Sequence, residues 1–260
     1  MDREEMLGIL RRKDSSYRER FFSAISSTGI VCMIDCPAKV HQERNITFYE
    51  RLDDAINEGY RPCKLCMKDK AYPELKRYTT TVLSPLGRIL LASDGEALTS
   101  LRFNDTPGVE RALNGFHVEE RELPIFEDAR YWLETYFAGQ DPKKTLRTRI
   151  CGSSFLREVC QEVANIPYGR TLTFSALASE LARRHGRKRS ARTVGGAVRR
   201  SPMSIIVPCH RVVRAGGCIT GHGGGAVRKT ALLRLEGAVA ANMKCPVKES
   251  RAEWAELDGH

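Results

Sequence analysis

The sequence contains no long hydrophobic run. None of its apolar stretches approaches the roughly 20 residues that a membrane-spanning helix needs. The first residues, Met1–Glu5, are mostly charged and lack the basic start and apolar middle of a secretory signal peptide. We therefore expect no membrane contact and a place inside the cell, either the nucleoid-associated cytoplasm of a bacterium or the nucleus of a eukaryote.

Internal repeats, coiled-coil heptads and low-complexity tracts are also absent. The 260 residues, 42% hydrophobic and 28% charged, describe a soluble globular protein that is long enough for two domains. We expect a monomer.

A disulfide framework is not indicated either. Nine cysteines in a chain of this length, with two closely spaced pairs, are typical of metal ligands and a reactive thiol in a reducing compartment. Four of the nine show no ligand spacing: Cys151, Cys160, Cys218 and Cys245.

Positive charge is present in excess and is unevenly placed. The net charge is +10, but residues 141–236 carry 19 Lys and Arg against 5 Asp and Glu, so the remainder is slightly acidic. Basic residues that neutralise phosphates release counterions, which gives affinity for nucleic acid with steep salt dependence. The segment 141–236 is expected to bind DNA, and a merely solvated basic face is the alternative.

Four cysteines near the N-terminus have the spacing of a metal site. Cys32 and Cys36 are separated by three residues, a gap of 26 residues follows, and Cys63 and Cys66 are separated by two. This pattern is typical of a tetrahedral zinc site with four thiolates at about 2.3 Å from the metal.

Hydrophobic periodicity and capping residues predict the coarse secondary structure. A small antiparallel meander is expected from Thr81 to Phe103, with turns at Pro85-Leu86-Gly87 and Asp94-Gly95. The two helices nearest the basic turn His185–Arg189 predict a helix-turn-helix. The expected helices are Leu52–Glu58, Ile125–Phe137, one from a cap at Ser153 or Ser154 to about Pro167, one from a cap at Thr173 to about Arg184, and Ala191–Arg199 with a cap at Ser190. In the helix Ile125–Phe137, one apolar stripe is expected from Ala129, Trp132, Leu133, Tyr136 and Phe137.

The segment Ser204–Val212 has the strongest chemical signal. An apolar stretch, expected to be a strand, ends at Val207 and is followed by Pro208-Cys209-His210-Arg211-Val212. The thiolate is the nucleophilic form of cysteine, and a free thiol with a pKa near ~8.5 needs a base or a positive field to form it at neutral pH. His210 is the candidate base for Cys209, and an inert core cysteine is the alternative.

The pentapeptide from Pro208 to Val212 is the active-site signature of the methylated-DNA–protein-cysteine methyltransferases, which the chain resembles from about residue 77 to 237. The resemblance implies that Cys209 irreversibly accepts an alkyl group from O6-alkylguanine, and also from O4-alkylthymine. It implies that the thiol loses its proton through a water molecule to His210, and that Glu236 orients the imidazole. On spacing alone, Glu236 also fits an ordinary surface carboxylate.

The same resemblance implies how DNA is bound. A base inside the duplex must be flipped out before it can react, which leaves a gap in the stack. The segment Ala191–Val198 looks like the family's minor-groove helix, in which Arg192 enters that gap. Further DNA contacts are expected from Gly195, Gly196, Arg199, Arg200 and Arg211.

Three pocket positions depart from the family pattern. Phe174 stands where the family usually has a tyrosine, whose hydroxyl group stabilises the departing purine. Ser201 replaces an asparagine that braces the turn beneath the thiol, and His222 replaces a tyrosine of the substrate loop. These departures bear on the rate and the alkyl preference rather than on the reaction class.

The N-terminal stretches Tyr17–Phe22, Thr28–Cys32 and Gly59–Cys63 resemble the N-terminal domain of the Ada-type DNA repair proteins, over about residues 14–68. The resemblance implies one zinc ion, with Cys32 as both a ligand and the acceptor of a methyl group from a backbone methylphosphotriester. A purely structural zinc site is the alternative. Lys39, Arg44 and Asn45 are the candidate phosphate contacts.

The expected fold is therefore mixed α/β (α+β), with a zinc domain, a ribonuclease H-like subdomain and a helical, winged-helix-like domain. The expected function is single-turnover DNA repair. An alkylation-responsive transcription regulator and a non-catalytic lesion sensor are the alternatives. The expected division is 1–68 for the zinc domain, 69–76 for a linker, 77–140 and 141–237 for the two parts of the alkyltransferase, and 238–260 for a tail.

Overall fold

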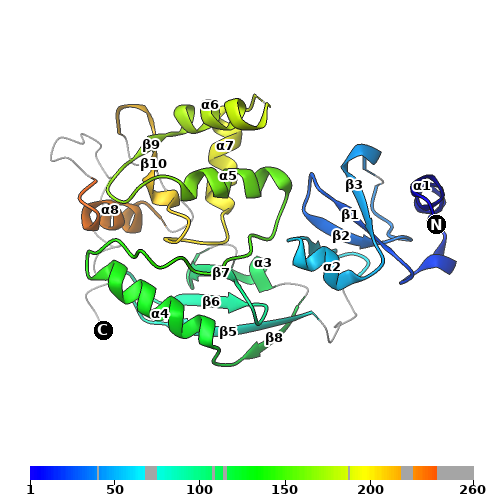
Figure 1. The fold of residues 1–260 in the computed structure, drawn as a ribbon, viewed down its shortest axis with the longest axis horizontal. Coiled ribbons are helices and arrows are strands. Elements are labelled where there is room, and N and C mark those ends of the chain that lie inside the picture. The colour runs from blue at the N-terminus through cyan, green and yellow to red at the C-terminus, as the bar shows by residue number, and fades with distance from the viewer. Residues whose placement is uncertain are drawn as a thin grey trace.

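The computed structural model of the chain describes residues 1–39, 41–67, 75–106, 109–113, 116–186, 188–217 and 225–238. The chain forms three units: an N-terminal unit at the right of Figure 1 and, beside it, a helical unit that lies above a sheet unit. We call residues 1–67 the N-terminal unit, residues 75–137 the sheet unit and residues 154–238 the helical unit. Among the described residues, no helix has both the length and the apolar character that crossing a membrane requires.

The N-terminal unit is a four-stranded sheet with a helix on either side. Its strands β1 (Phe22–Ile25), β2 (Ile30–Met33), β3 (Ile46–Tyr49) and β4 (Arg61–Pro62) have the order β3-β1-β2-β4. The helices are α1 (Arg3–Arg12) and α2 (Leu52–Asn57). Helix α1 was not predicted, although its signal is local: the Asp2 carboxylate accepts from Glu5 N, and Glu5 reaches back to Asp2 N in a capping box.

The sheet unit contains the predicted meander and one additional strand. β5 (Lys76–Val82), β6 (Ile89–Ser93) and β7 (Leu98–Phe103) are antiparallel neighbours, and β8 (His117–Glu120) pairs parallel to β5 at the other edge. The short helix α3 (Val109–Leu113) precedes β8, and α4 (Pro124–Phe137) covers one face of the sheet. Of the predicted apolar stripe of α4, Phe137 is half-buried and the other four residues are buried, together with Phe126.

The helical unit begins at α5 (Ser154–Ala164) and continues with α6 (Phe174–His185), α7 (Ala191–Arg200) and α8 (Gly225–Leu235). The two short strands β9 (Leu172–Thr173) and β10 (Val212–Val213) pair in parallel. The predicted caps are confirmed, because the hydroxyl groups of Ser153, Thr173 and Ser190 accept from the first turns of α5, α6 and α7. Helices α6 and α7 form the predicted helix-turn-helix.

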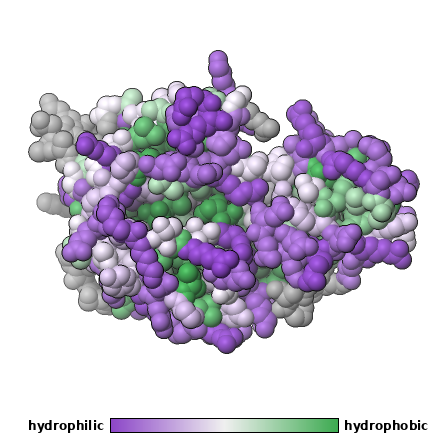
Figure 2. Space-filling view, viewed as in Figure 1, coloured by the Kyte–Doolittle hydropathy of each residue, from purple (hydrophilic) through white to green (hydrophobic). Residues whose placement is uncertain are grey.

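The sheet and helical units share one hydrophobic core. It runs from Ile89 and Phe126 in the sheet unit to Val159 and Leu177 in the helical unit. Strand β7 is buried along its whole length because later segments cover it, with bridges from Leu98 to Thr148 and from Leu101 to Met203. In the space-filling view the surface is mostly hydrophilic, and hydrophobic residues show mainly along the seam beneath α5 (Figure 2).

The N-terminal unit contacts the start of α5 through its backbone. Gly152 N donates to Gly59 O at 2.7 Å, and Ser154 N donates to Ser26 O at 3.0 Å. Gly29 has a φ of +69°, and a Cβ there would lie 2.2 Å from the carbonyl carbon of Gly152. Only glycine permits this close approach.

One predicted element is wrong. The segment Ser204–Val207 is not a strand but a compact turn, in which Ile206 N donates to Ser204 O at 2.7 Å. Ile205 has a φ of +66°, a conformation that costs free energy for a β-branched residue.

Two other predictions fall mainly outside the described residues. These are most of the linker and all but the first residue of the 238–260 tail. At the end of the expected linker, Leu75 is buried against Phe22 and its neighbours, and Lys76 already belongs to β5.

Candidate active site and metal centre

Cys209 lies at the first position of a short 3-10 helix, Cys209–Arg211, directly after the strained turn. Its N–H donates to Val207 O at 2.7 Å, which ties the thiol-bearing residue to the turn. The side chain is 5% exposed, and it lines a cavity of about 640 Å³. The thiol is therefore protected by the fold but reaches a space large enough for a small ring system.

The cavity brings together residues that the sequence predicted to act together. Phe174 at the start of α6 and Arg192 at the start of α7 line it with Cys209. A Cβ at Gly195 would lie 3.4 Å from the Phe174 ring. The absence of a side chain at Gly195 therefore lets this ring pack close to α7. Arg199 and Arg214 complete the basic part of the lining.

His210 and Glu236 form a buried pair next to Cys209. His210 Nε2 and Glu236 Oε1 are 2.7 Å apart, and both side chains are inaccessible to solvent. Tyr136, from α4, donates its hydroxyl hydrogen to the same Oε1 at 2.7 Å. When Nε2 carries the proton shared with Glu236, Nδ1 of His210 is left as a base.

The second nitrogen of that imidazole has no partner among the described residues. His210 Nδ1 is buried and makes no hydrogen bond. Buried polar atoms are almost always satisfied by protein or water, so this position favours an ordered water molecule.

Arg211 has a different role from the predicted DNA contact. Its guanidinium donates to Glu236 through Nε at 2.8 Å and Nη2 at 3.0 Å, and Nη1 donates to Ile166 O at 2.6 Å. The residue is 8% exposed. Because its donors face inward, Arg211 fixes the Glu236 carboxylate rather than reaching a phosphate.

These contacts set the protonation states of Glu236 and His210. Burial alone would raise the pKa of Glu236, but hydrogen bonds from His210 and Arg211 outweigh it and hold the pKa at about 2. Burial lowers the pKa of His210, against the opposing effect of Glu236. At neutral pH the pair therefore consists of a carboxylate and a neutral imidazole that is ready to accept a proton.

The Cys209 thiol itself is not acidic in the resting protein. Burial raises its pKa, and the positive charges of Lys229 and Arg102 oppose this only in part. Lys229 is 1% exposed, donates to Val212 O, and has its pKa lowered by burial to about 8. Forming the thiolate therefore requires transfer of the proton to a base.

Tyr136 and Lys229 were missed as site residues by the sequence analysis. Tyr136 was placed on the apolar stripe of α4, and the only signal of its role is that a buried tyrosine hydroxyl needs a partner. Lys229 precedes Leu232 and Leu233 at helical spacing on the buried side of α8, which is an unusual position for a lysine.

The remaining predicted residues lie in several places. Ser201 is buried, accepts from Met203 N at 3.4 Å and donates to Met203 O at 3.3 Å, so its hydroxyl group braces the turn after α7. Gly196 is half-buried, near Arg200. Arg200 is exposed and lines a different cavity from Arg199. His222 lies outside the described residues.

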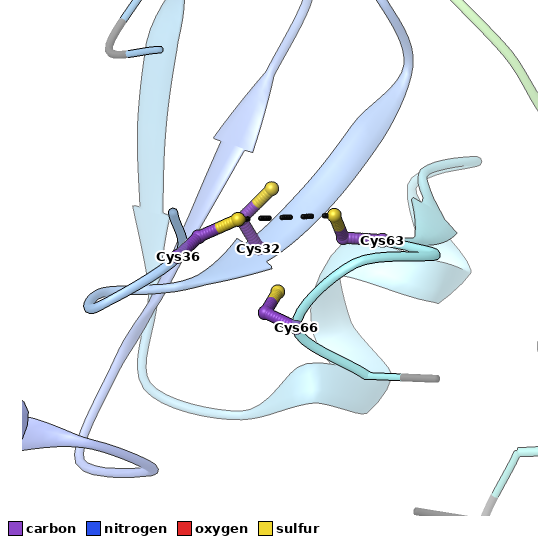
Figure 3. A group of neighbouring side chains, drawn as sticks. All are labelled: Cys32, Cys36, Cys63 and Cys66. Atoms are coloured by element: carbon purple, nitrogen blue, oxygen red, sulfur yellow. Dashed lines mark hydrogen bonds between the residues drawn. The ribbon is translucent and has the colours of Figure 1, made fainter. Parts of the chain in front are cut away.

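The four N-terminal cysteines converge, as predicted. Their sulfur atoms all lie within 4.8 Å of one another, and those of Cys36 and Cys63 are 3.9 Å apart (Figure 3). Four sulfurs at about 2.3 Å from a tetrahedral metal ion would be about 3.8 Å apart, so the set fits a metal ion. Hydrogen bonding within the group raises the pKa of Cys32 and lowers that of Cys63, so the four thiols titrate as one coupled set.

Cys32 also lines a small cavity of about 40 Å³, together with Cys36, Lys39 and His41. Lys39 is exposed there, as a phosphate contact requires. Arg44 is exposed on the 3-10 helix Glu43–Asn45 and is not part of this lining.

Comparison with known proteins covers all three units. The family "Metal binding domain of Ada" matches residues 5–69. The ribonuclease-like domain of 6-O-methylguanine DNA methyltransferase matches residues 77–150, and the DNA binding domain of the same family matches residues 154–238.

Individual relatives agree with these matches. A methylated-DNA–protein-cysteine methyltransferase of Mycobacterium leprae is 39% identical over 59% of this chain and 88% of its own length. The crystal structure of Mycobacterium tuberculosis O6-methylguanine methyltransferase is 35% identical, with a TM-score of 0.54, over 64% of this chain and 96% of that chain. The same organism's OGT in complex with DNA is 34% identical, with a TM-score of 0.53, over 65% and 96%. The chain thus belongs to the methylated-DNA–protein-cysteine methyltransferase family, with a metal-binding domain of the Ada type at its N-terminus.

Proposed function

We propose that the protein reverses DNA alkylation directly, with Cys209 as the acceptor of alkyl groups from O6-alkylguanine and O4-alkylthymine. The observation that carries this proposal is the Cys209 thiol at a cavity of about 640 Å³, next to a buried imidazole that a carboxylate holds as a base. A flipped base in this cavity would place its alkyl carbon against the sulfur.

The transfer is a single displacement. The Cys209 proton passes through a water molecule at the unpartnered Nδ1 to His210, and Glu236 stabilises the imidazolium that forms. The sulfur–carbon bond forms as the bond between the alkyl carbon and O6 breaks. The purine then takes up a proton at N1 from the surrounding water and leaves as guanine, and His210 returns the proton that it accepted to the solvent. The thioether is stable, so each molecule acts once.

DNA binding follows from the placement of α7. Arg192 is exposed at the start of this helix and lines the Cys209 cavity, so it can fill the gap that a flipped nucleotide leaves in the stack. Arg199 faces the same cavity and is proposed to hold a phosphate. A relative of 34% identity was solved in complex with DNA, which supports DNA as the partner. We propose that α7 contacts this DNA through its minor groove.

The second proposed acceptor is Cys32, for the methyl group of a backbone methylphosphotriester. Zinc is the proposed metal, held by Cys32, Cys36, Cys63 and Cys66, and when bound it keeps the sulfurs as thiolates at neutral pH. Four thiolates and a divalent ion carry a charge of about −2, which repels phosphodiesters but not a neutral triester. Methylation of Cys32 removes one negative charge, so it would strengthen the affinity of this unit for DNA.

The alternative of a transcription regulator rests on the likeness of the four-cysteine unit to that of the Ada-type regulators and on this charge change. The alternative of a lesion sensor rests on Phe174, which offers no hydroxyl group to the departing base, and on His222, which lies outside the described residues.

The test uses two duplexes, one with a single O6-methylguanine and one with a single methylphosphotriester. Peptide mass spectrometry then locates the methyl group. We expect it on Cys209 from the first duplex and on Cys32 from the second. Methyl transfer that persists in Cys209→Ala, or triester transfer that persists in Cys32→Ser, contradicts the respective assignment. Cys160→Ala is the matched control, because this buried thiol lies outside the cavity lining.

A further inference from the structure

A second cavity, of about 220 Å³, lies where the three units meet. The N-terminal unit contributes Thr28 and Arg61, and the sheet unit contributes Arg77 and Arg102. The end of α7 contributes Arg200. This cavity shares no lining residue with the cavity of Cys209 or with the four-cysteine cluster.

The lining is strongly basic. It contains four arginines, and no aspartate or glutamate belongs to it among the described residues. The nearby carboxylate of Asp94 is already paired with Arg149. The start of α5 adds to this field, because Gly152 and Ser153 lie in the wall and precede an eleven-residue helix.

Arg77 is the residue of this lining whose surroundings point most clearly to an anion as ligand. It is 2% exposed, and its guanidinium stacks 3.8 Å from the centre of the Phe116 ring. Among the described residues, Nη1 donates to Lys76 O at 3.0 Å, and Nη2 makes only a long contact, 4.0 Å, with the Cys151 sulfur. Nε is buried and has no partner among the described residues.

A buried guanidinium without a carboxylate is unfavourable, because its hydration is lost and no negative charge replaces it. An anion in the cavity would supply that charge. Guanidinium groups match the paired oxygens of phosphate and bind it with two parallel hydrogen bonds.

We propose that this cavity binds a phosphate-class anion, either a phosphodiester of the DNA backbone or free phosphate, between the N-terminal unit and the two methyltransferase units. Arg61 and Arg77 belong to different units, so the bound anion would hold these units together. Arg200 ends the helix whose first turn carries Arg192, so the cavity lies on the same element that is proposed to enter DNA.

The test measures the thermal unfolding midpoint in sodium phosphate against sodium chloride of equal ionic strength. A ligand that binds only the folded state raises the midpoint with its concentration. We expect phosphate to raise the midpoint of the native protein, and Arg61→Gln and Arg200→Gln each to remove at least half of that shift. Arg88→Gln, an exposed arginine of the sheet unit outside the cavity, should show the full shift. Arg61→Lys, which keeps the charge, should retain part of it.

An unmodified duplex separates the two sources of phosphate. When the DNA backbone is the natural ligand, bound duplex abolishes the effect of phosphate, and Arg61→Gln reduces the slope of log Kd against log salt by about 0.9. When free phosphate is the ligand, the phosphate shift persists with duplex bound and the slope is unchanged. The proposal is overturned by the following result. Phosphate raises the unfolding midpoint equally in the native protein, in Arg61→Gln and in Arg200→Gln, and Arg61→Gln leaves the slope of log Kd against log salt unchanged. None of these readouts requires alkyl transfer, so they are independent of the proposed reaction.

Discussion

The surroundings of Cys209 and Cys32 differ in how they control a sulfur nucleophile. Cys209 sits alone in a protein cavity, where burial raises the pKa of its thiol, and it depends on a neighbouring base. Cys32 belongs to a cluster of four sulfurs, where a metal ion would take the place of the proton. Under the proposed function, one chain contains two solutions to the same problem, a proton relay and a metal centre, and each can be disrupted separately.

The largest expected effect is from Cys209→Ala. Methyl transfer from O6-methylguanine should fall below detection, because the described cavity contains no other thiol, whereas transfer from the triester should keep its native rate. Single-turnover assays with each duplex measure both. A parallel loss of triester transfer would mean that the two sites are not independent.

Removal of the metal by a chelator should abolish triester transfer and leave base-lesion transfer intact, which is the reverse of the result expected for Cys209→Ala. Structural zinc sites contribute about 10–16 kcal/mol in small domains, so the N-terminal unit should lose its fold and its triester transfer. Base-lesion transfer should persist, because the His210–Glu236 pair lies in the helical unit. Circular dichroism and the two transfer assays, with metal re-addition as the control, report the outcome. Unchanged triester transfer after complete metal loss contradicts a metal-held acceptor.

Glu236→Gln should slow base-lesion transfer by about 100-fold, because the imidazolium loses its carboxylate. It should also destabilise the helical unit by about 3–5 kcal/mol, since Arg211 is left buried without a counter-charge. Tyr136→Phe is the matched control, since it removes one hydrogen bond to the same oxygen and leaves the charge. If Glu236→Gln and the native protein transfer the methyl group at equal rates when both are saturated with the lesion duplex, Glu236 does not take part in the proton relay.

Phe174→Tyr should accelerate transfer by about ten-fold, because a hydroxyl group in the cavity could donate to the departing purine, which is worth about 1–3 kcal/mol. Phe155→Tyr, outside the cavity lining, is the control. A slower Phe174→Tyr variant would show that the cavity is shaped for the smaller ring.

The smallest effect concerns pH. Burial lowers the pKa of His210, so the neutral imidazole persists below the ordinary value of about 6.5. The transfer rate should therefore stay level from pH 7.5 to about 6.5 and decline only in more acidic solution. Because Glu236 raises the pKa of His210, Glu236→Gln should move this decline to still lower pH. A decline centred above pH 7 contradicts a neutral, buried base.

The comparison of the two sites also shows what the sequence could predict. The ligand spacing of Cys32, Cys36, Cys63 and Cys66 is local information, and the cluster followed from it. The caps Ser153, Thr173 and Ser190 are equally local and placed three helices correctly. The pairing of His210 with Glu236 came from the resemblance to a family, since 26 positions separate them and spacing alone left a surface carboxylate equally acceptable.

What was missed depends on long-range packing. Apolarity suggested a strand at Ser204–Val207, but the bridge from Met203 to Leu101 and the positive φ of Ile205 make a turn there. Arg211 was expected to contact DNA on the strength of the family resemblance, and only the fold shows that its guanidinium donates to Glu236. Tyr136 reaches Glu236 from α4, 100 residues away.

The stoichiometry of methyl transfer tests the account most directly. The intact protein is incubated with an excess of both lesion duplexes, alone and together, and the methyl groups per chain are counted by mass spectrometry. The account predicts one group from the base lesion, one from the triester, and two from the mixture. Repeated turnover on the base lesion, or a single shared methyl group from the mixture, would contradict two separate sulfur acceptors.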